Sequence, residues 1–415
     1  MRDVSRRSDV FIVGAGPAGA TAAIRLLQRR PHLSVTLLDR QAFPRDKSCG
    51  DGLGPGVVRV LNELGIAHLL DGQSSPTAVR VVGPDGIIAT ARGPIIGGKD
   101  LRGFVVPRHD FDAMLVREAV RLGARFVQGT FKGTDLEATD RLVHYRVKGS
   151  SITESTRLLM GADGAYSLVR KALGLRGADD KVRHIAMRAY CKLDAPEQPP
   201  ALQLEFTKAL LPAYGWVFPL TEGRANIGVG LPLSIFKNRR LDLDKLLDDF
   251  VVALNERGYR VTDVEGRRSH HLPHSAGLVP MTHKRAVLIG DAAGTINALS
   301  GEGIYYGMRA GVELADTLTP AGEPRLSDSQ ESLRSFERRF RRSLRRHFFS
   351  AYAAHRMLQY EAWARLVIGA AAKDPRVMEG AALMLFDDGF IRPGTTLRIL
   401  TSPLRRTRRP TVTSA

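Results

Sequence analysis

Three glycines and a later aspartate have the spacing that binds a dinucleotide. Gly14, Gly16 and Gly19 form the pattern G-x-G-x-x-G, and Asp39 follows twenty residues after Gly19. In such a motif the first glycine permits a tight turn, the second lets a pyrophosphate approach the backbone, and the third lets helix and strand pack closely. The aspartate accepts hydrogen bonds from an adenosine ribose. The chemistry indicated is recognition of the ADP half of NAD or FAD; the alternative is a tight turn that binds nothing.

The elements around these residues are those that must position them. Residues 10–13 form an apolar run typical of a buried strand, and residues 35–38 form a second one that ends at Asp39. Between them, apolar residues at helical spacing predict an amphipathic helix. Its N-terminus would offer unpaired N–H groups and a partial positive charge to the phosphates. We therefore expect Ala15, Ala18 and Arg40 to lie at the cofactor as well.

Two further acids follow predicted strands and stand among small residues. Asp163 lies in the segment G-A-D-G, and Asp291 lies in G-D-A-A-G. Small residues let the backbone come close to a ligand, and the carboxylates could accept ribityl or ribose hydroxyls. The alternative for each is an ordinary helix N-cap.

The composition limits the class of protein. A chain of 415 residues is too long for one ordinary core, so we expect at least two lobes. Only two cysteines occur, Cys49 and Cys191, which excludes a disulfide framework and a metal cluster and fits a reducing cytoplasm. No apolar run is long enough to span a membrane, and the basic start followed by an apolar strand lacks the cleavage site of a signal peptide.

The formal net charge is +18, and much of it lies in residues 334–346 and 405–409. A solvated face with a disordered tail is one interpretation, and peripheral contact with an anionic membrane is another. No nucleic-acid motif accompanies the charge, so we expect no nucleic-acid partner. The oligomeric state stays open.

The order of strand and helix patterns predicts an α/β fold. We expect a Rossmann-type domain from residues 1–75, 101–175 and 282–330, with an inserted, mostly antiparallel β-sheet substrate domain from residues 76–100 and 176–281. Residues 331–403 predict a C-terminal helical region, and residues 404–415 a disordered basic tail. Within this reading, residues 157–160 form one short strand and a single helix over 241–257 interrupts the second sheet.

Cysteine and aromatic residues supply the candidate catalytic groups. Cys49 lies in a Gly- and Pro-rich loop over residues 40–58, and loops of this length in compact domains usually serve function. Tyr214, Trp216 and Phe218 alternate along a predicted strand, so they form one face. That face is either ordinary core or the wall of an apolar pocket, and Cys49 is either a buried structural thiol or a proton donor or positioner.

The three Gly-rich segments together resemble the flavoproteins built like para-hydroxybenzoate hydroxylase. Lys47 to Leu53, K-S-C-G-D-G-L, is similar to the K-x-C-G-D-G loop of the geranylgeranyl reductase family. Residues 214–219, Y-G-W-V-F-P, followed by Gly228-Val229-Gly230, resemble its Y-x-W-x-F-P…G-x-G signature. The resemblance implies FAD and the reduction of isolated carbon–carbon double bonds in prenyl chains, with Cys49, Tyr214 and Trp216 at the alkene. It also implies cofactor contacts, which we expect at Cys49, Gly50, Arg108, Val127, Gly301, Gly303 and Ile304.

Other members of the same fold are the main alternative. Flavin hydroxylases usually carry His where this chain has Gly294, and halogenases carry W-x-W-x-I-P with a catalytic lysine, where this chain has Tyr214 and Phe218 and no evident lysine. A hydroxylase or halogenase acting on an aromatic or polyketide substrate is thus the second hypothesis. For Arg108 the alternative is a surface ion pair with Asp110 or Asp112.

No second complete nucleotide fingerprint is evident. NAD(P)H or another reductant would therefore visit the cofactor transiently as electron donor, and the substrate would be a hydrophobic small molecule or lipid.

Overall fold

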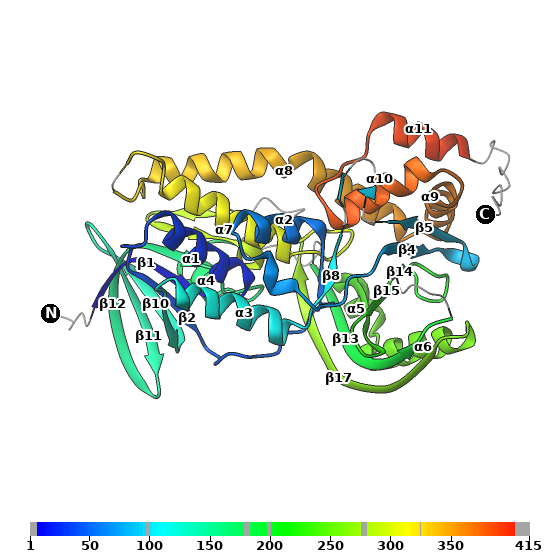
Figure 1. Cartoon of the computed structure of the whole chain (residues 1–415), viewed down its shortest axis with the longest axis horizontal. Coiled ribbons are helices and arrows are strands. Elements are labelled where there is room, and N and C mark those ends of the chain that lie inside the picture. The colour runs from blue at the N-terminus through cyan, green and yellow to red at the C-terminus, as the bar shows by residue number, and fades with distance from the viewer. Residues whose placement is uncertain are drawn as a thin grey trace.

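The computed structural model describes residues 6–402 apart from 94, 97, 98, 101, 178–182, 197–200, 275–279 and 324. Two sheets lie side by side, each with its own helices, and one long helix runs along an edge of both lobes (Figure 1). The expected α/β fold with a Rossmann-type domain, a second sheet and C-terminal helices is confirmed. The basic tail proposed from residue 404 lies outside the described residues.

The first sheet contains eight described strands in the order β10-β11-β12-β1-β2-β9, with β19 beside β12 and β18 beside β19. Strands β9, β2, β1, β12 and β19 are parallel, so their carboxyl ends meet at one edge, where a Rossmann-type fold binds its ligand. The strands are β1 (Arg6–Val13), β2 (Val35–Asp39), β9 (Arg125–Gln128), β10 (Thr130–Leu136), β11 (Arg141–Val147), β12 (Ser150–Gly161), β18 (Thr282–His283) and β19 (Ala286–Leu288).

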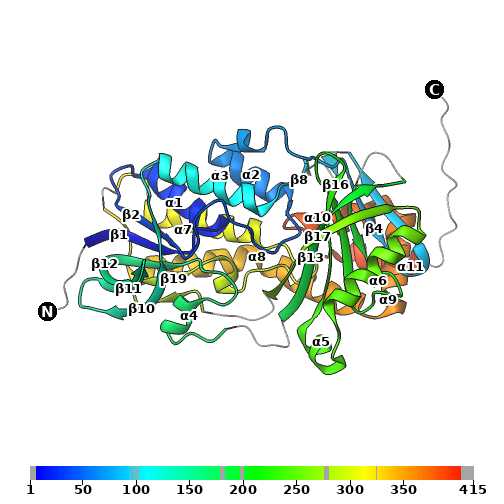
Figure 2. The same ribbon diagram turned by 90° about the horizontal axis from the view of Figure 1, so that it is seen from below.

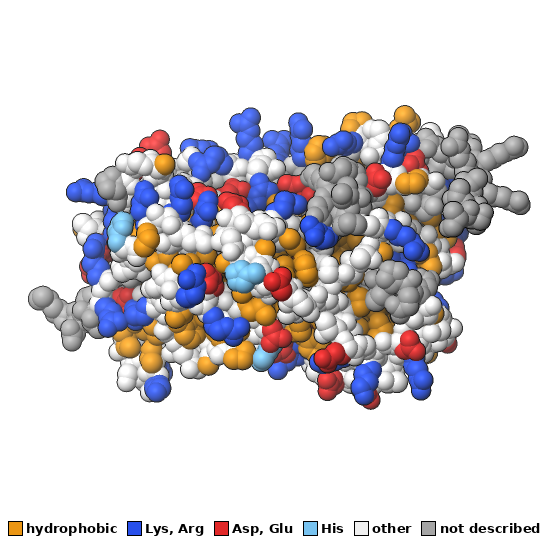
Figure 3. Space-filling view, viewed as in Figure 1, with side chains coloured by type: hydrophobic (Ala, Val, Ile, Leu, Met, Phe, Trp, Pro, Cys, Tyr) orange, Lys and Arg blue, Asp and Glu red, His pale blue; other side chains and the backbone are white. Residues whose placement is uncertain are grey.

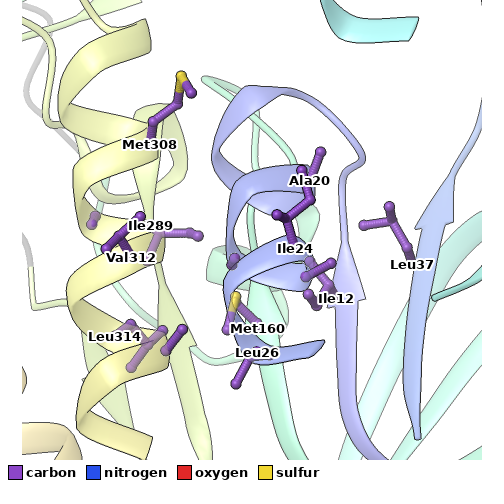
Figure 4. Packing of buried hydrophobic residues seen from close by; sticks show 14 of the residues in the cluster. Ile12, Ala20, Ile24, Leu26, Leu37, Met160, Ile289, Met308, Val312 and Leu314 are labelled. Atoms are coloured by element: carbon purple, nitrogen blue, oxygen red, sulfur yellow. The ribbon is translucent and has the colours of Figure 1, made fainter. Parts of the chain in front are cut away.

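Helix α1 (Pro17–Arg29) is held between the first sheet and α7 (Ile304–Leu318). Ile24 and Leu26 are fully buried, and Figure 4 shows them between Ile12 of β1 and Val312 of α7. Small residues allow this close contact, because a Cβ at Gly311 would lie 2.9 Å from the Ala18 carbonyl oxygen. The other helices of this lobe are α2 (Pro55–Glu63), α3 (Arg108–Arg121) and α4 (Leu168–Ala172).

The second sheet has the order β17-β13-β16-β15-β14-β4-β5 and is antiparallel except where β14 meets β4. Helices α5 (Leu233–Arg239) and α6 (Leu243–Glu256) cover one face (Figure 2). The strands are β4 (Ala78–Val82), β5 (Ile88–Arg92), β13 (Arg183–Asp194), β14 (Leu202–Glu205), β15 (Tyr214–Pro219), β16 (Arg224–Pro232) and β17 (Arg260–Pro273). Two small pairs complete the strands: β3 (Gly52–Leu53) with β8 (Phe104–Val105), and β6 (Ile95–Ile96) with β7 (Lys99–Asp100).

The C-terminal helices join the two lobes. Helix α8 (Gln330–Leu358) packs on α7 at one end and on α9 (Glu361–Lys373) at the other. Helices α9 and α10 (Pro375–Phe386) pack against β5 and share an apolar core with one face of the second sheet. Helix α11 (Pro393–Thr401) follows them.

Several element boundaries differ from those expected. The short strand expected at residues 157–160 is the end of the twelve-residue β12, whose polar first half pairs with β11 and so gave no apolar signal. The single helix expected over 241–257 is α6, and α5 precedes it, ended by Arg240 in the left-handed region at φ 48°. Arg108, one of the expected cofactor contacts, is the first residue of α3.

Candidate active site

A cavity of about 600 Å³ lies between the two lobes. Its lining comes from the Gly-rich turn after β1, the loop after β2, the start of α3, the segments after β12 and β19, one face of the second sheet and the end of α10. Residues far apart in the sequence thus share one space. One part of its wall is polar and charged, and the other is aromatic and aliphatic.

The Gly-rich turn leaves room for a ligand only at its middle glycine. Gly14 has φ +102°, and a Cβ there would lie 2.2 Å from the carbonyl oxygen of Ala162. A Cβ at Gly19 would lie 2.0 Å from the carbonyl oxygen of Gly14, so this position needs glycine for packing. At Gly16 the nearest atoms to a Cβ are guanidinium nitrogens of Arg45 at 3.6 Å and Arg108 at 3.9 Å. An open glycine between two cations fits a pyrophosphate.

Asp39 lies at the end of β2, beside this turn. One carboxylate oxygen accepts a hydrogen bond from the Ala15 N–H at 3.0 Å, and the other accepts one from the Gln41 N–H at 3.0 Å. Arg45 approaches the same carboxylate at 3.7 Å. Backbone donors therefore fix the carboxylate at the cavity wall, where a ribose hydroxyl could donate to a remaining lone pair.

Arg108 is buried and holds a bidentate ion pair with Asp112, at 2.6 and 2.7 Å. Arg45 reaches the same carboxylate at 3.1 Å, so one buried acid anchors two arginines that both line the cavity. The alternative of an ion pair with Asp112 thus exists, but in the interior instead of on the surface. Sequence reasoning missed Arg45, because nothing in its loop distinguishes it from the neighbouring charged residues.

The carboxylates of Asp163 and Asp291 differ in their partners. Asp163 lines the cavity, yet its oxygens accept hydrogen bonds from the Ser167 hydroxyl and from the N–H groups of Leu168 and Val169, so it caps α4. Asp291 lines the cavity and pairs with the Lys47 ammonium at 3.2 Å. Burial opposes ionisation of Asp291, but Lys47 and His270 outweigh it, and the pKa of this carboxyl lies below its ordinary value. Asp291 is therefore a charged acceptor ready for hydroxyl groups.

The loop that carries Cys49 is organised by Asp51. Asp51 is fully buried at φ 62° and accepts hydrogen bonds from the Tyr190 hydroxyl at 2.7 Å, the Asn226 amide at 2.8 Å and the Arg108 N–H at 3.2 Å. Burial raises the pKa of this carboxyl to about 6, although hydrogen bonds from Tyr190 and Asn226 oppose the rise. Burial likewise raises the pKa of the Cys49 thiol, so the neutral thiol lines the cavity.

Tyr214, Trp216 and Phe218 point to one face of β15, and glycines opposite them make the room. Tyr214 pairs with Gly230 and Trp216 with Gly228 across to β16. A Cβ at Gly228 would lie 2.2 Å from the Trp216 ring, and one at Gly230 would lie 2.8 Å from the Tyr214 ring. The Trp216 and Tyr214 rings therefore pack directly on the backbone of Gly228 and Gly230, where any larger residue would collide with them.

The Cys49 loop and the aromatic strand meet at the cavity. The Trp216 indole N–H donates to the Asn226 side-chain oxygen at 2.9 Å, and the Asn226 amide donates to the Cys49 carbonyl oxygen at 2.8 Å. Phe218 packs against Gly50 and Gly52, whose Cβ positions lie 3.2 and 3.1 Å from its ring. Sequence analysis placed Cys49, Tyr214 and Trp216 together but did not single out Asn226 and Asp51, which connect them.

Most of the expected site residues line this cavity: Gly14, Gly16, Ala18, Asp39, Arg40, Cys49, Gly50, Arg108, Asp163, Tyr214, Trp216, Asp291, Gly301, Gly303 and Ile304. Ala15 and Gly19 lie just behind the wall, in the roles described above. Val127 is not among the lining residues, whereas Gly129 and Thr130, two and three positions later, are.

Residues 7–339 match the family of the FAD binding domain. The menaquinone reductase of Mycolicibacterium smegmatis is 32% identical over 324 residues, which are 77% of this chain and 78% of that protein. The geranylgeranyl diphosphate reductase of Rhodobacter capsulatus is 32% identical over 327 residues, 76% of this chain and 77% of that protein. The chain therefore belongs to the FAD-binding domain family and, within it, to the geranylgeranyl reductase family of FAD-dependent oxidoreductases.

Solved structures agree on the fold. A geranylgeranyl bacteriochlorophyll reductase-like protein of Thermoplasma acidophilum has a TM-score of 0.79 at 21% identity, over 95% of this chain and 96% of that one. The flavin-dependent brominase Bmp2 has a TM-score of 0.69 at 18% identity, over 96% of this chain and all of that one (100%). At these identities the likeness concerns architecture alone.

The polar part of the cavity fits FAD. Gly16 with Arg45 and Arg108 would hold the pyrophosphate, Asp39 the adenosine ribose, and Asp291 the ribityl hydroxyls. When bound, the flavin supplies hydride transfer to or from carbon.

Proposed function

We propose that the protein reduces carbon–carbon double bonds of an isoprenoid chain with hydride from reduced FAD. The observation that carries the proposal is the composition of the cavity wall beyond the flavin-binding residues. Tyr214, Trp216 and Phe218 face the cavity there, joined by Leu204, Leu272, Leu385 and Phe386. A prenyl chain has no polar handle, so its orientation must come from shape, and rigid aromatic rings give shape at low entropic cost.

The names of the relatives support this substrate class. Menaquinone and geranylgeranyl diphosphate, the molecules in those names, both carry an isoprenoid chain. The archaeal relative named digeranylgeranylglycerophospholipid reductase is 27% identical over 73% of this chain and adds a prenyl lipid to the set. As electron donor we propose NAD(P)H or another two-electron reductant that reaches the flavin transiently.

The deciding experiment is reduction without oxygen. The FAD-loaded protein is reduced anaerobically with NADPH, NADH or dithionite and mixed with geranylgeranyl diphosphate, a menaquinone or a prenyl phospholipid. We expect flavin reoxidation and a product two mass units heavier, with the added hydrogens in the chain and not in the quinone ring. Turnover only with oxygen and an aromatic substrate would instead establish the hydroxylase or halogenase hypothesis.

Cys49→Ala and Trp216→Ala are each expected to lower alkene reduction about tenfold or more while FAD binding survives. Both residues line the aromatic part of the cavity, and neither is a proposed phosphate or ribityl contact. The measurements are anaerobic turnover with a prenyl substrate and FAD affinity by fluorescence quenching. Cys191→Ala is the matched control for the thiol, because Cys191 is buried in the core on the far face of the second sheet. Wild-type turnover in both cavity variants would show that Cys49 and Trp216 only pack in the wall and take no part in the reaction.

We also propose peripheral contact with an anionic membrane through the C-terminal helices, since a lipid substrate must be taken from a bilayer. Phe349 of α8, Trp363 of α9 and Leu397 of α11 are 75%, 41% and 63% exposed. Figure 3 shows Lys and Arg side chains along the edge formed by α8, with hydrophobic side chains at the α11 end. None of the described helices has the length and apolarity needed to cross a membrane.

The double variant Leu397→Ser/Leu400→Ser is expected to weaken co-sedimentation with anionic vesicles severalfold, because two exposed apolar side chains lose their insertion energy. Val252→Ser is the control, since Val252 is 55% exposed but lies on α6, on the opposite face of the second sheet from α9, α10 and α11. Binding should also fall as salt is raised. No vesicle binding by the wild-type protein at low salt would contradict the proposal.

A further inference from the structure

The loop Gly301–Gly303 joins the two parts of the cavity. A Cβ at Gly301 would lie 3.2 Å from the Tyr214 hydroxyl, which belongs to the aromatic wall. A Cβ at Gly303 would lie 3.2 Å from a carboxylate oxygen of Asp291, which belongs to the ribityl site. Glu302, between these glycines, is half-buried and lines the cavity. It thus lies where the cofactor-binding part and the substrate part meet.

The backbone holds the Glu302 carboxyl in place. One oxygen accepts a hydrogen bond from the Tyr305 N–H at 3.0 Å, in the first turn of α7. The other lies 3.5 Å from the Cβ position of Gly54, in the segment that follows the Cys49 loop. A carboxyl fixed by backbone groups keeps its position whether or not it carries a proton.

Glu302 differs from the other acids of the cavity wall in what it pairs with. Asp46 pairs with Arg188 and Asp291 with Lys47, while Asp39 has Arg45 nearby and Asp163 caps α4. Among the described residues Glu302 makes no ion pair. Burial therefore raises the pKa of this carboxyl to about 7, although backbone hydrogen bonds and the charge of Arg108 oppose the rise.

The charged and titratable groups around Glu302 come from four neighbouring segments. They are Arg108 of α3, Asp291 after β19, Tyr214 of β15 and Tyr306 of α7. Burial raises the pKa of both tyrosines, and Asp291 stays ionised. Near neutral pH Glu302 is therefore the group among them that changes its charge.

We propose that Glu302 is the acid that delivers the proton in alkene reduction, an inference that rests on the function proposed above. One alkene carbon would take hydride with its electron pair, the chemistry that bound FAD would supply once an NAD(P)H-class donor has reduced it. The second alkene carbon takes the proton as the Glu302 O–H bond breaks and a C–H bond forms. The carboxylate that remains regains a proton from water. Cys49 then positions the alkene instead of protonating it.

Glu302→Gln removes the acidic proton and keeps the shape. With reduced FAD and a prenyl substrate, its turnover is expected to fall roughly a hundredfold or more. FAD affinity and the rate of flavin reduction by dithionite should stay at wild-type values. Wild-type kcat/KM should decrease as the pH rises through about 7, because the protonated acid is lost, and this step should be absent in the variant. Glu313→Gln is the control, since Glu313 lies on α7, the helix that follows Glu302, but pairs with Arg309 and does not line the cavity.

Infrared difference spectra of the FAD-loaded protein between pH 5.5 and 8.5 give a readout apart from activity. We expect a protonated-carboxyl C=O band that disappears through about pH 7 in the wild type and in Glu313→Gln. In Glu302→Gln this band should be lost, which leaves only the band of Asp51 that disappears through about pH 6. Turnover of Glu302→Gln within threefold of wild type with an unchanged pH profile, or a pH step removed only by Cys49→Ala, would overturn the assignment. If the wild-type protein reduces no alkene, the proposed function fails with it; if it reduces alkenes and the band is missing, only the role of Glu302 fails.

Discussion

Gly16→Val is expected to yield folded protein that has lost its FAD. The backbone at Gly16 faces the cavity, and the nearest atoms to an added Cβ are the two guanidinium groups of Arg45 and Arg108, at 3.6 and 3.9 Å. The side chain therefore fits when the cavity holds no ligand, but it fills the space a pyrophosphate needs. Loss of close backbone contact and of the charge-assisted bonds to both arginines should lower FAD affinity by about a hundredfold or more.

Absorbance of the purified protein at flavin wavelengths and titration of stripped protein with FAD measure this effect. Gly133→Val is the matched control, because Gly133 lies in β10 but does not line the cavity, and its nearest neighbour is 4.0 Å from the added Cβ. Circular dichroism should be the same for both variants. Full flavin occupancy in Gly16→Val would mean that the pyrophosphate lies elsewhere.

Gly228→Ala is expected to destabilise the second sheet by about 3 kcal/mol, the upper end of the cost of roughly 1–3 kcal/mol that is typical when a well-packed core is overpacked. The added Cβ would lie 2.2 Å from the Trp216 ring and 2.4 Å from the carbonyl oxygen of Met187. The ring has to leave its place, and its hydrogen bond to Asn226 is then lost. The Asn226 amide also donates hydrogen bonds to the Cys49 carbonyl oxygen and to Asp51. Displacement of Asn226 should therefore also displace the Cys49 loop in the cavity wall.

Denaturant unfolding gives the free energy, and tryptophan fluorescence reports Trp216, since the chain has only one other tryptophan, the more exposed Trp363. Gly369→Ala makes the same chemical change in α9, where an added Cβ meets no atom within 4 Å, and should be neutral or slightly stabilising. An unchanged denaturant midpoint for Gly228→Ala would show that the Trp216 ring can adopt another position without a loss of stability.

The sequence by itself determined the parts of the protein whose signals are local. The strand, the Gly-rich turn, the helix and Asp39 lie within a few dozen residues, and each position is constrained by its immediate neighbours. The alternation of Tyr214, Trp216 and Phe218 likewise fixes one face of a strand, because side chains alternate along a strand whatever the rest of the fold. Together with the later Gly-rich segments and the resemblance of residues 47–53 and 214–230 to known motifs, these signals were enough for the family, the α/β fold and FAD.

Only the tertiary structure decided which polar groups meet and what burial does to them. Arg108 and Asp112 are four residues apart on one helix, but Arg45 joins this pair from a distant loop, and Asp51 bonds to Asn226 and Tyr190 over sequence separations that no periodicity encodes. Glu302 looks like any loop glutamate in the sequence; its raised pKa comes from desolvation by segments that are distant in the chain. The physical reason is that propensity and pattern depend on near neighbours, whereas ionisation and hydrogen-bond pairing depend on whatever the fold places within a few ångströms.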